Sequence, residues 1–231
     1  MARRLARCEQ PRMRFAGWKA MTTDDLIRAL AADGHVGRKP VTALRIALPA
    51  ATALAALLFF TRIGFRDDLE AALHTVRFLF KFAVILPLAV VAVGGLFRNT
   101  GPIPSPGRWV TLLPLPLVLL GVGVVAELLA IPQSEWQARL IGSNAVNCMT
   151  LIPLLAAGPL AMFIAALRNG AAVHPGLSGA MAGLAAGSIA AAFYAMNCFD
   201  DSPLFVITWY PFAILAAVLA GYFCGVRVLQ W

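Results

Sequence analysis

The sequence predicts an all-α integral membrane protein with six transmembrane helices. Of its 231 residues, 60% are hydrophobic and only 13% are charged, whereas soluble domains carry about 25% charged residues. Its mean hydropathy is +0.79. Unpaired backbone groups are costly in hydrocarbon, so apolar spans form helices. The period-two alternation that indicates a membrane β-barrel is absent.

Six apolar stretches are each long enough to cross a bilayer, because a hydrocarbon core of about 30 Å needs about 20 apolar residues in a helix. The first forty residues are polar and basic, and the first apolar run is too long for a signal peptide, so we expect that run to stay in the membrane. The six predicted spans are Val41–Thr61, Val76–Phe97, Val110–Ala130, Asn147–Leu167, Leu177–Met196 and Leu204–Val226.

The basic residues predict that both termini are cytoplasmic. With the N-terminus inside, fourteen Lys and Arg residues fall on the inner side, ten of them in residues 1–45, and five fall on the outer side. This distribution agrees with the positive-inside rule. The net charge of +8 is therefore mainly a topology signal. We expect no direct contact with nucleic acid, because the short soluble arm has no room for a recognition module.

Residues 1–40 are predicted to form a cytoplasmic arm, and residues 41–231 a six-helix membrane domain. A short amphipathic helix is expected in the arm, with Thr22 or Thr23 as its cap and Gly34 at its end. Met21 directly precedes this helix. We therefore expect that translation can begin at Met21, which would make residues 1–20 an over-long start; the intact mass of the native protein tests this.

The arm helix is a candidate binding segment. A helix of about ten residues is marginal alone in water, so we expect it to pack on the membrane surface or the bundle, or to dock in a partner's groove. Two acidic residues in its first turn favour the positive end of the helix dipole. The apolar face of this helix carries Leu26, Ile27 and Leu30.

Small residues in the fifth span predict close helix packing. Gly179, Gly183 and Gly187 recur at four-residue spacing, which lets another helix backbone approach closely. We interpret this stripe as a packing surface rather than a ligand path.

Two of the four cysteines are candidates for a sensor. Counted from the inner loop between the fourth and fifth spans, Cys148 and Cys198 reach similar depths at the outer face of one hairpin. Three readings stay open, namely a structural disulfide, a redox or metal switch, and unpaired thiols. Asp200, Asp201 or His74 could help the two thiolates to hold a transient soft metal ion. We expect no resident cofactor.

The sequence gives no evidence for an enzyme. It contains no Cys-x-x-Cys, His-Glu-x-x-His, Walker loop or Gly-x-Ser-x-Gly motif. The alternative function is a small transporter or metal-handling carrier, favoured by prolines in the spans and by Glu127 in the third span. That carboxylate is a functional candidate, although we expect it to reach the interface and be solvated. Internal repeats and charges at the midplane, which a transporter should show, are not apparent.

Three blocks of sequence resemble the NrsF-type membrane anti-sigma factors. They are "TTDDLIRALAAD" in the arm, "AAFYAMNCFDDSPLFVITWY" from the fifth span into the sixth, and "GVRVLQW" at the C-terminus. Proteins of this family are small six-span regulators that restrain extracytoplasmic-function sigma factors in proteobacteria. The resemblance extends over residues 21–231.

The resemblance implies a partner, a binding segment and a sensor. The partner would be an extracytoplasmic-function sigma factor. The family's sensory cysteine pair would correspond to Cys148 and Cys198, and oxidative or heavy-metal stress at the pair would release the sigma factor. The sigma-binding segment would correspond to Asp24, Asp25, Leu26, Ile27, Arg28 and Leu30.

Overall fold

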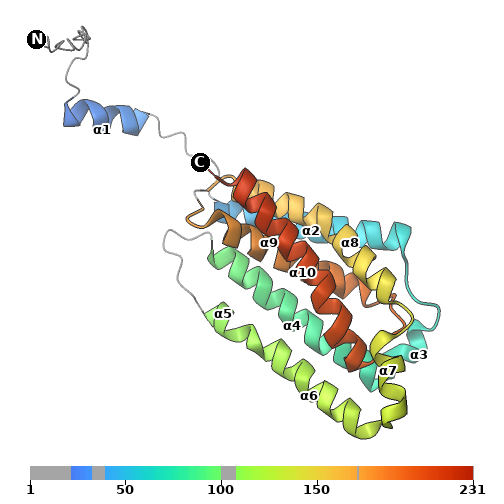
Figure 1. The fold of residues 1–231 in the computed structure, drawn as a ribbon. Coiled ribbons are helices and arrows are strands. Elements are labelled where there is room, and N and C mark those ends of the chain that lie inside the picture. Colours follow the sequence, from blue (N-terminus) through green and yellow to red (C-terminus); the bar gives the residue numbers. More distant parts are fainter. Residues whose placement is uncertain (1–21, 33–39, 100–107, 171, 231) are drawn as a thin grey trace, which may run out of the picture. The chain divides into compact units, whose positions relative to one another are not determined.

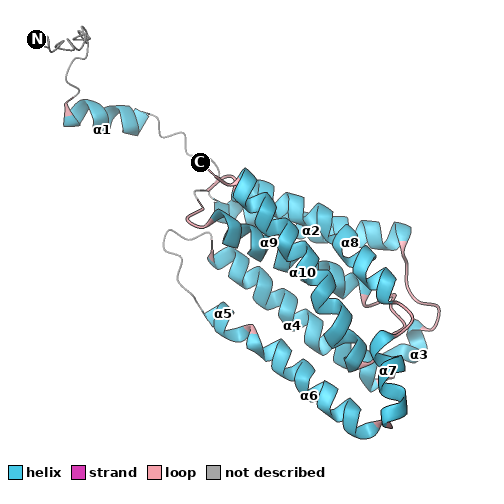
Figure 2. Cartoon of the chain, viewed as in Figure 1, coloured by secondary structure: helices cyan, strands magenta, loops and turns pink. Residues whose placement is uncertain are grey.

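The computed structural model describes residues 22–32, 40–99, 108–170 and 172–230. The chain divides into two units, Met1–Gly37 and Arg38–Trp231, each of which is described by itself. All the regular structure in the described part is helical (Figure 2).

The arm contains one helix, α1 (Thr23–Ala32), and its start is fixed by reciprocal capping. The Thr22 hydroxyl accepts the N–H of Asp25 at 3.3 Å, and the Asp25 carboxylate accepts the N–H of Thr22 at 3.3 Å. This capping box satisfies two backbone donors at the helix start. It identifies Thr22, rather than Thr23, as the cap.

The second unit is a bundle of long helices joined by short ones (Figure 1). The short helices are α3 (Leu69–Leu73), α5 (Arg108–Leu112) and α7 (Gln133–Ile141). The long helices are α2 (Pro40–Arg62), α4 (Val76–Arg98), α6 (Pro114–Ala130), α8 (Ala145–Leu167), α9 (Pro175–Tyr194) and α10 (Pro203–Val228).

Within the described residues, five helical segments are long and apolar enough to cross a membrane, and α6 is apolar but shorter. The predicted span Val110–Ala130 is interrupted, because α5 ends at Leu112 and α6 begins at Pro114. Proline lacks an N–H and disfavours helical geometry in the residue before it, so a helix restarts there. The 17 residues of α6 extend about 25 Å, against a hydrocarbon core of about 30 Å.

Helix α9 lies at the centre of the bundle. It packs most extensively on α10, then on α4 and α8, and also touches α2. By contrast, α6 lies at the edge of the bundle, where it has only limited contacts with α4 and α10 (Figure 1). The core is therefore built around α9, with α6 its most loosely held long helix.

The α9–α10 contact is backbone against backbone. A Cβ atom added to Gly179 would collide with the carbonyl oxygen of Gly221, and one added to Gly183 would collide with that of Ala217. At Gly187 the approach is looser, since an added Cβ would lie 3.2 Å from the Ala217 Cβ. The two glycines nearer the start of α9 thus make the closest approach of the pair.

Candidate functional site

The loop between α9 and α10, residues 195–202, joins several elements at one end of the bundle. Helix α9 ends at Tyr194, and the N–H of Cys198 donates to the Tyr194 carbonyl at 3.1 Å. At the other end of the loop, the Ser202 hydroxyl accepts the N–H of Leu204 at 3.3 Å and caps α10. The end of α9 and the start of α10 therefore hold both ends of this loop, which we call the cysteine loop.

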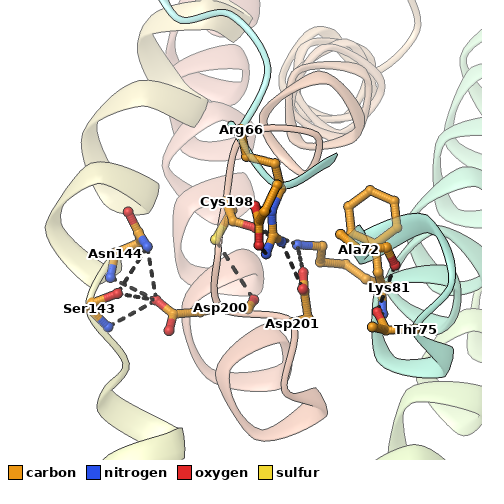
Figure 3. Close-up of polar contacts among 11 residues, drawn as sticks. Arg66, Ala72, Thr75, Lys81, Ser143, Asn144, Cys198, Asp200 and Asp201 are labelled. Atoms are coloured by element: carbon orange, nitrogen blue, oxygen red, sulfur yellow. Dashed lines mark hydrogen bonds and ion pairs between the residues drawn. The ribbon is translucent and has the colours of Figure 1, made fainter. Parts of the chain in front are cut away.

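Two buried cations converge on this loop from distant parts of the chain (Figure 3). Arg66, between α2 and α3, donates to the Cys198 carbonyl at 3.1 Å and to Asp201 at 2.8 Å. Lys81, on α4, donates to the same carbonyl at 3.0 Å and to Asp201 at 2.5 Å. Lys81 is completely buried. Buried charges need such partners to offset the loss of water.

Arg66 has a second carboxylate and two aromatic neighbours. Its guanidinium contacts both oxygens of Asp68 at 2.5 and 2.8 Å. It also lies over the Phe199 ring, 4.7 Å from the centroid, and near Phe78 at 5.8 Å. The hydrogen bond from Arg66 lowers the pKa of Asp68, and the same bond raises the pKa of Arg66. Both groups are therefore charged at neutral pH.

Asp200, next to Asp201 in the chain, binds a different element (Figure 3). Its carboxylate accepts the backbone N–H groups of Ser143 and Asn144 at 2.9 and 2.8 Å. Asn144 is the N-cap residue of α8, and its own side chain makes no capping bond. Asp200 instead binds the N–H of the N-cap residue itself and places its negative charge at the positive end of the helix. The adjacent aspartates thus fasten the loop to α8 on one side and to Arg66 and Lys81 on the other.

The predicted cysteines lie in the hydrophobic core, one on α8 and one in this loop. Cys148, in the first turn of α8, and Cys198 are free thiols, both completely buried in the same hydrophobic core. The Cys198 thiol lies 3.8 Å from the carbonyl oxygen of Asp200. Burial raises the pKa of Cys198, and the charge of Lys81 opposes that effect. Burial thus favours the protonated form of the Cys198 thiol.

Glu127 of α6 is also buried at this end, so the expectation of a solvated carboxylate is wrong. It is bound by Arg77 at 3.1 Å, by Arg139 at 3.3 Å and by the Ser202 hydroxyl at 3.3 Å. Three donors from separate elements make burial of the charge tolerable. Through Ser202, Glu127 connects α6 to the cysteine loop.

Sequence reasoning missed Arg66 and Lys81, which were interpreted only as topology signals. For Lys81 a signal was available, because an ionisable residue inside an apolar run is a functional candidate. Arg66 lies in a polar loop and carries no comparable signal.

The other predicted metal neighbour, His74, caps the end of α3 and is exposed. Within the described residues, no three His, Cys, Asp or Glu side chains are arranged to hold a metal ion. The two aspartates that were predicted to assist the thiols have their carboxylates bonded to the groups named above.

The predicted binding segment lies on α1. Asp24, Asp25, Ile27 and Arg28 are exposed, with Ile27 57% accessible. The side chains of Leu26 and Leu30 lie outside the part of the chain that the structure describes, as do Cys8 and residues 1–20.

One protein family matches residues 30–231, which include the whole cysteine loop and its partners. It is NrsF, described as a negative regulator of sigma F. The chain belongs to the NrsF family. The "Anti-sigma-F factor NrsF" of Caulobacter vibrioides (strain NA1000 / CB15N) is 34% identical over 222 residues, which cover 91% of this chain and 100% of the relative.

A second NrsF relative is the "Probable anti-sigma-F factor NrsF" of Azospira oryzae (strain ATCC BAA-33 / DSM 13638 / PS). It is 30% identical over 215 residues, which cover 91% of this chain and 100% of the relative. No solved structure matches the chain. Membership of the NrsF family thus rests on sequence along most of the chain.

Proposed function

We propose that this NrsF-family protein is an inner-membrane anti-sigma factor with cytoplasmic termini. Its arm holds an extracytoplasmic-function sigma factor, and oxidative or heavy-metal stress at the periplasmic Cys148–Cys198 pair releases it. The observation that carries the proposal is the pair of buried free thiols at a loop that fastens α4, α8 and the α2–α3 segment together.

The site is suited to act as a switch because Cys198 shares one short loop with the fastening groups and Cys148 lies in the first turn of α8, to which Asp200 fastens that loop. A disulfide brings two sulfur atoms to about 2.05 Å, closer than unbonded sulfur atoms can lie. We expect that joining Cys148 to Cys198 shifts the start of α8 relative to the loop. The Cys198 carbonyl and the carboxylates of Asp200 and Asp201 have to move with it or break their bonds to the neighbouring elements.

The energy required is modest. Changing a sigma factor from mostly bound to mostly free takes about 3 to 5 kcal/mol of difference in affinity between the two thiol states. A disulfide can supply a constraint of that order. By linkage, the bound sigma factor must favour the reduced pair by the same amount.

The sigma-binding segment is proposed to be the face of α1 that carries Asp24, Asp25, Leu26, Ile27, Arg28 and Leu30. The exposed Ile27 and the exposed charges beside it are available to a partner. An amphipathic helix of this kind docks its apolar face in a partner's groove.

A pull-down tests the proposal. The full-length protein is extracted from membranes and incubated with the sigma factors of its own cell, with and without hydrogen peroxide. Wild type should retain one sigma factor when reduced and release it on oxidation. Cys148→Ser/Cys198→Ser should retain it under both conditions, while Cys224→Ser, which removes an exposed thiol, should behave like wild type.

A second variant tests the arm. Leu26→Asp/Leu30→Asp should lose the sigma factor under reducing conditions and still insert into the membrane. If that variant binds as wild type does, the binding site lies elsewhere. If no condition retains a sigma factor, the anti-sigma role itself is refuted.

A further inference from the structure

One set of bonds holds the cysteine loop to the helix that carries the other thiol. The Asp200 carboxylate accepts the N–H of Asn144 at 2.8 Å, and the Asn144 carbonyl accepts the N–H of Cys148 at 2.8 Å. Asn144 therefore connects the loop directly to the first turn of α8, where Cys148 lies. We call the bonds of Asp200 to the start of α8 the α8 tie. A movement of the loop toward Cys148 is a movement toward the partners of Asp200, so this tie does not oppose the approach of the thiols.

A second set of bonds holds the loop to other elements. The carbonyl of Cys198 itself accepts Arg66 at 3.1 Å and Lys81 at 3.0 Å, and Asp201 binds both cations as well. Arg66 follows α2, and Lys81 belongs to α4. Figure 3 shows Lys81 and Asn144 on opposite sides of the loop. We call these bonds the cation tie, and a movement of Cys198 toward α8 stretches them.

The cation tie resists such a movement. Lys81 is completely buried, and a buried cation that loses its counter-charge is strongly destabilised. In the reduced protein the Cys198 thiol lies 3.8 Å from the carbonyl oxygen of Asp200, within its own loop. A disulfide needs the two sulfur atoms at about 2.05 Å. Forming one therefore acts first on the bonds to the Cys198 carbonyl, which belongs to the same residue as the reacting sulfur.

We propose that Asp200 and Asp201 are positioning residues that act on the thiol pair in opposite directions. Asp200 favours the Cys148–Cys198 disulfide, because it holds the loop to the helix of the other thiol, and Asp201 opposes it through the cation tie. On oxidation the cation tie breaks and the α8 tie stays. The inference rests on the proposed function, since it names the groups that determine how readily that thiol switch responds.

The test measures the equilibrium between the thiol pair and a small disulfide. Full-length protein in lipid nanodiscs is incubated without oxygen in mixtures of β-mercaptoethanol and its disulfide. The two protein S–H bonds break and the Cys148–Cys198 S–S bond forms, while the S–S bond of the reagent breaks and its two sulfur atoms take up the two protons. Alkylation and mass spectrometry give the fraction oxidised, with equilibrium reached from both the reduced and the oxidised protein.

The two aspartate variants should shift this equilibrium in opposite directions. Asp201→Asn should raise the equilibrium constant for the disulfide on the order of tenfold, the contribution of a hydrogen bond to a charged group. Asp200→Asn should lower it about fivefold, because it weakens the charge-assisted bonds of the α8 tie. Both substitutions remove a carboxylate that fastens the reduced fold. A purely structural role would therefore shift the two constants in the same direction.

Two further variants complete the set. Lys81→Met/Asp201→Leu removes most of the cation tie without leaving a buried cation unpaired, since Arg66 keeps Asp68. It should fold even if Asp201→Asn does not, and it should raise the constant at least tenfold. Asp67→Asn makes the aspartate-to-asparagine change at an exposed side chain between α2 and α3 and should match wild type.

The outcomes separate this inference from the proposed function. Shifts of the same sign in the two aspartate variants, or an unchanged constant in the double variant, overturn the inference and leave the thiol switch standing. If the constants shift as expected but the disulfide form still retains a sigma factor in the pull-down, the proposed function is overturned and the inference stands. If no mixture forms the Cys148–Cys198 disulfide in wild type, both are overturned.

Discussion

Adjacent aspartates with different partners allow a sharp test of the cysteine loop. Asp201→Asn removes the carboxylate that lies 2.5 Å from Lys81 and 2.8 Å from Arg66. Asp200→Asn makes the same chemical change one residue earlier, where the partners are the neutral backbone N–H groups of Ser143 and Asn144. Asp201→Asn therefore removes a counter-charge from buried cations, whereas Asp200→Asn removes none.

The expected losses of stability follow from the partners. Removing one member of a buried ion pair costs about 3–5 kcal/mol. Arg66 keeps Asp68, so the loss falls mainly on Lys81, whose other acceptor in the described structure is the Cys198 carbonyl. In Asp200→Asn the amide oxygen can still accept the two N–H groups. That variant loses only the charge assistance of these bonds, about 1 kcal/mol.

The assay is reversible unfolding in mixed micelles with increasing SDS, followed by circular dichroism. A double variant, Lys81→Met/Asp201→Leu, supplies an internal control, because replacing a whole buried pair by apolar groups is often neutral or stabilising. We expect it to be more stable than Asp201→Asn. Equal losses in the two aspartate variants, or a double variant less stable than Asp201→Asn, would refute the reasoning that Lys81 depends on Asp201.

Two further predictions concern the helices. Gly183→Ala should lower the free energy of unfolding by about 1–3 kcal/mol, because the new methyl group meets the backbone of α10. Gly121→Ala, where an added Cβ meets nothing within 4 Å, should be neutral or slightly stabilising in the same SDS assay. Thr22→Ala should speed amide hydrogen exchange in α1 about fivefold, since the cap that pairs with Asp25 contributes about 1 kcal/mol. Thr23→Ala should not speed it, and equal exchange in both variants would exclude the capping box as the determinant of the helix start.

Hydropathy predicted most of the membrane domain because burial in lipid acts on each span separately. The predicted Val76–Phe97 and the observed Val76–Arg98, for instance, differ by one residue. The third predicted span is interrupted before Pro114. Hydropathy did not predict the break, because a proline hardly changes the apolar character of the run. Backbone geometry sets that boundary.

The candidate site was likewise predictable from the sequence only in part. The loop "NCFDDSP" was recognisable because carboxylates and a thiol interrupt an apolar sequence. Its partners were not, since Arg66 is 135 residues from Asp201 and Lys81 is 120 residues away. No local spacing relates residues so far apart. Lys81 reaches the loop because α4 packs beside α9. Counting Lys and Arg residues on each side of the membrane gives no information about that contact.

The packing of α9 indicates how a change at Cys198 can act at a distance. At its C-terminal end, α9 leads into the cysteine loop, and near its start Gly179 lies against the backbone of α10 at Gly221 and Gly225. Contacts between backbones leave no flexible side chain to absorb a displacement, so we expect α9 and α10 to move as one body. Helix α2, which the arm enters at Pro40, packs on α8 and α9. A disulfide that shifts α8 against the loop would therefore strain the contacts of α2 with α8 and α9. On the proposed function, this strain is the structural difference between the two thiol states that linkage requires.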